Sequence, residues 1–311
     1  MTQSSPVSSA LASDRLVWLL AALPPLFWAG NFLLARMLRD AVPPFQMSFW
    51  RWVVALVILL PFAWSSVRAD FPGLRRDAPF LAVLGLIGVT AFNCLVYVAL
   101  HHTTVVNAAL INSLMPVATV LFAIVLLGDR PTGRQLAGIA VSLVGAAVIV
   151  GRGDPAPLLS LAFNQGDLLV LAGLTFWALY TVLIRWRPTR LAPLAFLAGT
   201  IAFGVLFHLP LVAWEVGNVG GFEPSLASAG GILYFAIFPS LLAYILWNRA
   251  VAALGPGRTG MFMHLMPIFS AVLGVTLLGE PFLAYHAVGI VLIIVGITLV
   301  NARKPPPQVR Q

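Results

Sequence analysis

One segment of this chain occurs twice, and that repetition constrains the fold more than any other feature of the sequence. Leu114-Met115-Pro116 and Leu127-Gly128-Asp129 match Leu265-Met266-Pro267 and Leu278-Gly279-Glu280, in both cases at a spacing of 151 residues. Further matches at nearly the same spacing pair Gly138 with Gly289, Gly145 with Gly296, and Phe27-Trp28-Ala29 with Phe176-Trp177-Ala178. The chain therefore contains two copies of one structural unit.

Both copies consist of long apolar stretches. Of the 311 residues, 60% are hydrophobic and 9% are charged, whereas soluble domains contain about 25% charged residues. About 20 apolar residues in a helix span the ~30 Å hydrocarbon core of a bilayer. We predict ten membrane-spanning helices, at residues 16–38, 44–64, 78–100, 104–127, 133–151, 165–186, 192–214, 229–252, 256–278 and 283–301.

Each copy contains five predicted spans, the first within residues 16–155 and the second within 156–302. Because five is odd, the second copy is inverted in the membrane relative to the first. The predicted fold is therefore an all-α integral membrane protein of two inverted five-helix repeats. Many secondary transporters have this architecture and bind substrate between the repeats, near the membrane midplane. Residues 1–15 and 303–311 are predicted to be disordered cytoplasmic tails.

The positive charges indicate an orientation. With the N-terminus inside, 14 of the 18 Lys and Arg residues fall on the inner side, and Arg36, Arg39 and Arg152 fall on the outer side. Cytoplasmic loops are rich in positive residues, so we expect a multi-pass protein of the cell inner (plasma) membrane with both termini in the cytoplasm. The arginines are scattered between spans and form no basic stripe, which argues against nucleic acid as a partner.

These features together resemble a known family. The ten spans, the five-plus-five repeat and the paired Pro and Leu-Gly-acid motifs are similar to the EamA-type branch of the drug/metabolite transporter superfamily, over essentially the whole chain after Arg15. Within that branch the chain looks most like the YddG-type aromatic amino acid exporters of bacterial inner membranes. The resemblance implies transport of small metabolites through a central cavity lined by the first, third, fourth, sixth, eighth and ninth helices, with the fifth and tenth at the periphery.

Pro116 and Pro267 interrupt the fourth and ninth predicted helices at matching positions. Each proline removes a backbone donor and frees a carbonyl about one turn earlier, which then needs either an aqueous cavity or a neighbouring side chain. Helix breaks at matching positions of inverted repeats favour a substrate site. The candidate substrate-binding residues around these helix breaks are Asn112, Met115, His264 and Met266. A buried histidine more often forms a hydrogen bond between helices than a proton relay.

Aromatic and amide side chains occupy equivalent positions in the two copies. Trp28 and Asn31 correspond to Trp177 and Tyr180, while Asn93 and Tyr97 correspond to Tyr244 and Asn248, with the amide and the phenol exchanged. We predict that these side chains converge on one cavity and bind an aromatic or amphipathic solute. The competing interpretation is that they are interfacial tryptophans and packing hydrogen bonds between helices.

Arg51 lies about two turns inside the second predicted span, where an unpaired cation costs at least ~2.5 kcal/mol. It can extend to the outer surface, donate to a backbone carbonyl, or bind a substrate carboxylate. The first two interpretations are favoured because no acidic residue is near it in the sequence.

Other function classes fit less well. An intramembrane enzyme needs convergent catalytic groups, whereas all ten carboxylates lie in tails, loops or span ends. An ion channel needs a ring of carbonyls or charges, made by the symmetry of several subunits. A single, internally duplicated chain instead suggests a pathway within one monomer. No ATP-binding motif is present, and we expect no metal and no other cofactor.

The expected function is that of a secondary transporter, an exporter or facilitator of small neutral or zwitterionic amphipathic metabolites, aromatic amino acids first, which works by alternating access. A proton-coupled drug/metabolite antiporter is the alternative, and an intramembrane enzyme is more remote. Because no span has a carboxylate at mid-depth, and a buried His264 would stay neutral near pH ~7, we expect transport down the substrate gradient. We predict a monomer in the lipid bilayer and leave a dimer open.

Overall fold

The computed structural model describes residues 6–103, 105–154, 156, 164–279 and 281–301, and the predicted tail at 303–311 lies outside them. All regular secondary structure in this part of the chain is helical. Ten helical stretches are long and apolar enough to cross a membrane. The predicted ten-span, all-α fold is confirmed.

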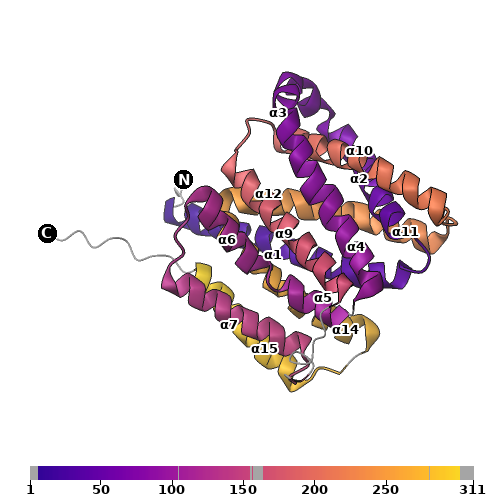
Figure 1. Cartoon of the computed structure of the whole chain (residues 1–311). Helices are drawn as coiled ribbons and strands as arrows, with labels where there is room; N and C mark the ends of the chain where they lie inside the picture. Colours follow the sequence, from indigo (N-terminus) through magenta and orange to yellow (C-terminus); the bar gives the residue numbers. More distant parts are fainter. Residues whose placement is uncertain (1–5, 104, 155, 157–163, 280, 302–311) are drawn as a thin grey trace, which may run out of the picture.

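Figure 1 shows the helices of both repeats, coloured along the sequence from the N-terminus to the C-terminus. The first five spans are α1 (Pro6–Leu38), α2 (Pro44–Ala69), α3 with α4 (Phe71–Leu84, Phe92–His102), α5 with α6 (Val105–Asn112, Met115–Leu127) and α7 (Gly133–Val150). The second five are α9 (Gln165–Trp186), α10 (Pro193–Asn218), α11 with α12 (Leu226–Phe235, Ala243–Leu254), α13 with α14 (Pro256–Gly260, Leu265–Leu278) and α15 (Ala284–Asn301).

Several helices are longer than their apolar stretches. α1 begins at Pro6, so residues 6–15, which we expected to be disordered, continue the first helix. α2 extends to Ala69 and α3 begins at Phe71, where we expected a loop from 65 to 77. Pro72 permits this because it falls in the first turn of α3, where a proline needs no backbone donor.

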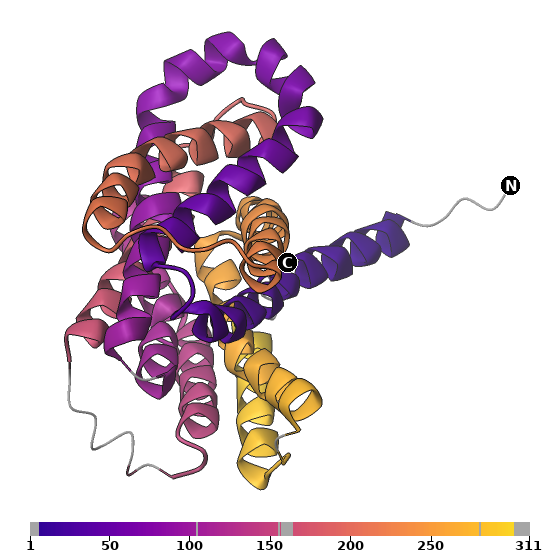
Figure 2. The same ribbon diagram turned by 90° about the vertical axis from the view of Figure 1, so that its right-hand side faces the viewer.

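Helices of the two repeats pack in equivalent pairs. α1 packs against α12 and α14, and its counterpart α9 packs against α4 and α6. α2 lies along α10, while α7 and α15 lie side by side at one edge of the bundle in both views (Figure 1, Figure 2). Glycines bring this last pair into backbone contact: a Cβ added to Gly296 would lie 2.5 Å from the Gly138 oxygen.

The third and eighth spans each contain one π-helical stretch, at Gly85–Ala91 and Ala236–Leu242. The two stretches occupy equivalent positions of the repeats. A π-helical turn interrupts the regular α-helical hydrogen bonding and occurs frequently at functional sites. Both stretches contribute carbonyl groups to the site described below.

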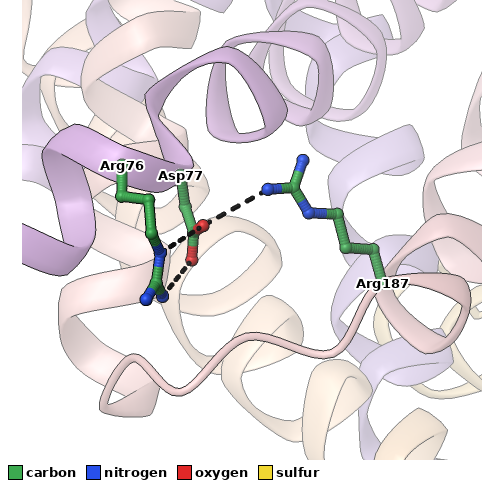
Figure 3. Close-up of polar contacts among 3 residues, drawn as sticks. All are labelled: Arg76, Asp77 and Arg187. Atoms are coloured by element: carbon green, nitrogen blue, oxygen red, sulfur yellow. Dashed lines mark hydrogen bonds and ion pairs between the residues drawn. The ribbon is translucent and has the colours of Figure 1, made fainter.

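The two ends of the bundle differ in charge. The end that contains residues 68–76, 128–134, 185–190 and 249–258 is rich in arginine, and we call it the arginine-rich end; the opposite one is the arginine-poor end. At the arginine-rich end, Asp77 of α3 binds Arg76 and Arg187 with N–O distances of 3.2 and 3.4 Å (Figure 3). Because Arg187 follows α9, this ion pair joins the two repeats.

Candidate functional site

Aromatic rings fill the interface between the repeats, midway along their helices. Trp28 of α1 and Trp177 of α9 meet edge to face, with ring centroids 5.1 Å apart. Four more rings surround the pair: Trp247 lies 5.3 Å from Trp28, and Tyr244, Phe92 and Tyr180 lie 5.0, 5.1 and 5.1 Å from Trp177. Both central tryptophans are buried, so neither belongs to an interfacial belt.

The indole nitrogens of these two equivalent tryptophans differ in their partners. Trp28 Nε1 donates to the carbonyl of Pro239, in the π-helical stretch of the eighth span, at 3.0 Å. The equivalent carbonyl in the third span, that of Gly88, instead accepts from the Tyr244 hydroxyl at 2.5 Å. Trp177 Nε1 is buried and has no hydrogen-bond partner in the described part of the chain.

A narrow gap next to these rings has a cavity volume of about 20 Å³, enough for about one water molecule, so a larger solute must widen it. It is lined by residues of the first, second, third, fourth, sixth and ninth spans, and therefore by both repeats. The lining residues are Trp28, Asn31, Phe32, Arg51, Phe92, Asn93, Val96, Tyr97, Asn112, Trp177, Met263 and Met266. Its wall is aromatic and apolar except at Arg51, Tyr97 and three asparagines.

Arg51 is 1% exposed and does not extend to the surface. Its Nη1 donates to the Tyr97 hydroxyl at 2.6 Å and to Asn31 Oδ1 at 3.3 Å. Its Nε donates to the Ser240 hydroxyl, in the second π-helical stretch, at 2.9 Å. Residues far apart in sequence thus hold one cation inside the membrane domain, and the expectation that Arg51 reaches the outer surface is wrong.

The exchanged amide and phenol side chains form equivalent contacts in the two repeats. The Tyr97 hydroxyl donates to Asn31 Oδ1 at 3.0 Å, and the Tyr180 hydroxyl donates to Asn248 Oδ1 at 3.3 Å. Asn93 Nδ2 donates to the Val89 carbonyl at 2.8 Å and approaches the Tyr244 hydroxyl at 3.5 Å. Tyr97 and Asn31 line the gap, whereas Asn248 lines a separate cleft at the arginine-rich end.

The gap adjoins a larger cavity that opens toward the arginine-poor end. This vestibule lies between the fourth, fifth, ninth and tenth spans, and it includes Arg152, Tyr285 and His286. Phe32, Asn112, Met263 and Met266 line both the vestibule and the gap. Asn112 Nδ2 and Met266 Sδ lie 3.5 Å apart across the repeat boundary, so these four side chains separate the two spaces.

The helix breaks before Pro116 and Pro267 meet each other. His264, at the break in the ninth span, donates from Nε2 to the Ser113 carbonyl at the break in the fourth span, at 2.8 Å. Its Nδ1 lies 2.7 Å from the Ser142 hydroxyl of α7. A side chain of the second repeat therefore bonds to a backbone carbonyl at this break, and His264 does not line the gap.

The structure thus divides the predicted site residues into two groups. Trp28, Asn31, Asn93, Tyr97, Asn112, Trp177 and Met266 line the gap, whereas Met115, Tyr180, Tyr244, Asn248 and His264 do not. Tyr244 and Tyr180 still pack against Trp177, and Met115 is part of the buried core. Phe32, Phe92, Val96 and Met263 were not among the predicted residues, because their apolar side chains do not differ in sequence from packing residues.

Two of the buried carboxylates, Glu215 and Asp167, are engaged at helix ends. Glu215 accepts from the backbone nitrogens of Phe45 and Gln46, at the start of α2, at 3.1 and 2.8 Å. Asp167 caps α9 together with Asn164. Such carboxylates stabilise the positive end of a helix dipole, which gives them a structural role outside the gap.

Comparison with known proteins places these observations in a family context. Residues 15–151 and again 164–302 match the EamA-like transporter family. A probable terminal-alkyne amino-acid exporter of Streptantibioticus cattleyicolor is 31% identical over 295 residues, which cover 93% of this chain and 94% of the relative. The uncharacterized transporter YyaM of Bacillus subtilis is 29% identical over 272 residues, which cover 88% and 89%. A solved crystal structure matches with a TM-score of 0.72 over 92% of this chain and 96% of that chain; at 20% identity it supports the fold alone.

Proposed function

The chain belongs to the EamA-like transporter family, and we propose that it is a secondary transporter that exports small neutral or zwitterionic amphipathic metabolites, with aromatic amino acids as the first candidates. The observation that carries this proposal is the gap between the repeats. One part of its wall consists of the rings of Trp28, Trp177 and Phe92, and another is polar, with Arg51 and Tyr97. An amphipathic solute needs both kinds of surface.

The direction and the chemical class have independent support. The relative from Streptantibioticus cattleyicolor is named an amino-acid exporter. An amino acid is zwitterionic near neutral pH, and the gap offers a cation together with amide oxygens. A YddG-type preference for aromatic side chains would follow from the ring cluster, since offset and edge-to-face ring contacts stabilise an aromatic ligand by about 0.5–1.5 kcal/mol each.

Alternating access fits the two ends of the bundle. The vestibule adjoins the gap at the arginine-poor end, while at the arginine-rich end the Asp77–Arg187 ion pair joins the repeats. By the positive-inside rule the arginine-rich end, and with it both termini, would lie in the cytoplasm of a cell with this protein in its inner membrane. The gap would then be nearer to the outside in this conformation.

Counterflow in proteoliposomes tests the proposal. Vesicles loaded with unlabelled L-phenylalanine should accumulate labelled L-phenylalanine and L-tryptophan transiently, and protein-free vesicles should not. L-Lysine and L-glutamate should give no counterflow, since a second charge would have no partner in the gap. Equal counterflow for all four amino acids, or for none, would overturn the assignment of substrate class.

A proton-coupled antiporter is the second candidate, and one observation favours it. His264 is a buried titratable group that contacts both a helix break of the first repeat and α7. Protonation there would alter a contact between the repeats. A pH gradient imposed on proteoliposomes with equal substrate on both sides separates this candidate from the first, since only an antiporter would then accumulate substrate.

A further inference from the structure

Arg51 holds a positive charge inside the membrane domain without a negative partner. It is 1% exposed, and its three hydrogen-bond acceptors, Asn31, Tyr97 and Ser240, are all neutral. None of the ion pairs among the described residues includes it. A buried charge is normally paired or bound to a metal, so this cation lacks the partner that its location requires.

The guanidinium also has unused donors. An arginine carries five N–H groups; here Nε–H bonds to Ser240, and the two hydrogens of Nη1 are directed to Asn31 and Tyr97. Nη2 makes no hydrogen bond to any residue that the structure describes, and Arg51 lines the gap. The two N–H groups of Nη2 diverge, so each can donate one charge-assisted hydrogen bond to an anion such as a carboxylate.

The neutral partners hold the guanidinium in place. Ser240 accepts from Arg51 and donates to the Phe235 carbonyl at 2.7 Å, and Tyr97 accepts from Arg51 and donates to Asn31. The guanidinium carbon lies 5.2 Å from the Trp52 ring centroid and 5.8 Å from that of Tyr97. A cation that is fixed in this way binds an anion with little further loss of side-chain freedom.

A second unused donor lines the same gap. Trp177 Nε1 is buried without a partner, because the carbonyl equivalent to the acceptor of Trp28 is bonded to Tyr244. Trp52 Nε1 also lacks a partner, but Trp52 packs against Tyr244 and does not line the gap. Of these two indole donors, only that of Trp177 belongs to a side chain that lines the gap.

The amides of the gap are arranged to complement these donors. Asn93 Nδ2 donates to the Val89 carbonyl and Asn112 Nδ2 to Met266 Sδ. Neither Oδ1 accepts a hydrogen bond from another described residue, so both are available as acceptors. An ammonium group needs such acceptors, and the gap consequently contains partners for both charges of a zwitterion.

From these contacts we infer that Arg51 is the carboxylate-binding residue of the transport site, and that its Nη2 group selects amino acids against their amides and amines. The inference deepens the proposed function and rests on it. In this arrangement the carboxylate lies at Arg51, and the side chain of the amino acid lies along Trp28, Trp177 and Phe92. Charge complementarity at Arg51 then excludes cationic aromatic amines, which share the rings but lack the anion.

Binding measured on purified protein in nanodiscs tests the inference with pairs of ligands that differ only in the carboxylate. The pairs are L-phenylalanine and L-phenylalaninamide, L-leucine and L-leucinamide, and phenylacetate and phenylacetamide. The last pair has no ammonium group and isolates the carboxylate. We expect the wild-type protein to bind the acid of each pair about 10- to 100-fold more tightly than the amide, the range for hydrogen bonds to a charged group.

Three variants locate the preference. Arg51→Gln should reduce it to within about threefold, since the charge is gone. Arg51→Lys should give an intermediate value, because an ammonium keeps the charge but not the planar, fixed donor geometry of the guanidinium. Thr200→Val is the matched control, since Thr200 occupies the equivalent position of the second repeat, is buried, and donates to the Phe196 carbonyl of its own helix. It should keep the full preference.

The outcomes separate the inference from the proposed function. Equal binding of acid and amide by the wild-type protein would overturn the inference without any variant, and so would a folded Arg51→Gln protein that keeps the preference. Discrimination within the leucine pair, with no binding of either phenylalanine compound, would overturn the aromatic substrate class and leave Arg51 as the carboxylate site. If the wild-type protein bound no compound of any pair, both would fall.

Discussion

Arg51 in the second span and Thr200 in the seventh occupy equivalent positions of the two repeats, but only Arg51 reaches beyond its own helix. The Thr200 hydroxyl donates to the Phe196 carbonyl of α10. Arg51 donates to side chains from the first, third and eighth spans. The polar part of the site is therefore asymmetric, although the chain is duplicated, and the solute would bind in one orientation.

The scaffold, by contrast, has stayed symmetric. The π-helical stretches occupy equivalent positions, and Gly128 and Gly279 end the fourth and ninth spans with the same φ of 68°. A φ in this left-handed region strains any residue with a Cβ. Backbone geometry therefore constrains both copies, because both must fold, whereas the side chains around the gap differ between them.

Removal of both central rings should have the largest effect. In Trp28→Ala with Trp177→Ala the two indoles that meet at 5.1 Å are lost together. We expect cells with this variant to lose their tolerance to toxic aromatic amino acid analogues, measured as growth at equal expression. Unchanged tolerance would mean that the aromatic pair, the most symmetric part of the site, does not contribute to transport.

The symmetric scaffold can be disrupted at a single glycine. In Gly296→Ala the new Cβ would lie 2.5 Å from the Gly138 oxygen and 2.6 Å from Ser142 Cβ, so α7 and α15 must separate. Such overpacking destabilises a protein by about 1–3 kcal/mol. The midpoint of thermal unfolding should fall, and Gly230→Ala is the control, since a Cβ there meets no atom within 4 Å. Equal midpoints for the two variants would contradict the close packing.

The two tryptophans differ in a way that conservative substitution can detect. Trp28→Phe leaves the buried Pro239 carbonyl without its indole donor, a loss of about 1–3 kcal/mol. Trp177→Phe removes a nitrogen that has no partner, so the free energy of unfolding without solute should fall less. Chemical denaturation in detergent measures both values. A greater loss for Trp177→Phe would show that the nitrogen has a structural partner and is not available to a solute.

The repeat explains which features the sequence predicts. Aligned copies identify the ten spans, the Trp28 and Trp177 pair, and the exchange of Asn93 and Tyr97 with Tyr244 and Asn248, because these depend on local pattern and on equivalence. The hydrogen bonds of Tyr97 with Asn31 and of Tyr180 with Asn248 are equivalent in the two repeats, but they appear only in the structure. Thus the fold and part of the gap's lining can be read from the chain alone.

The rest depends on three-dimensional contacts that no local pattern contains. Ser240 is 189 residues from Arg51, and the π-helical stretches have no common sequence motif. Asn248 lies one helical turn, about 6 Å, beyond Tyr244, which is enough to place it in the cleft at the arginine-rich end. Apolar residues of the gap, such as Phe32 and Met263, resemble packing residues until the gap is known.

The smallest expected effect concerns energy coupling and involves His264. His264 and Ser113 occupy equivalent positions of the two repeats, and the His264 ring is hydrogen-bonded to the Ser113 carbonyl. The Ser113 carbonyl can only accept, so His264 Nε2 carries a hydrogen. Nδ1 accepts when the Ser142 hydroxyl directs its one hydrogen to His264, 2.7 Å away, and not to the Ile139 carbonyl, 3.1 Å away. A neutral imidazole therefore satisfies both contacts, and no carboxylate is paired with it among the described residues.

We accordingly expect facilitated diffusion along the substrate gradient. In proteoliposomes with equal L-phenylalanine on both sides, an imposed pH gradient or membrane potential should cause no net accumulation, because no group of the gap needs to gain or lose a proton when the solute binds. His264→Gln should retain counterflow, since an amide can still donate to the Ser113 carbonyl. Uphill accumulation that an uncoupler abolishes, and that is absent from the His264→Ala variant, would reverse this expectation. His264 would then be the coupling residue, and it would differ in function from its equivalent, Ser113, as Arg51 differs from Thr200.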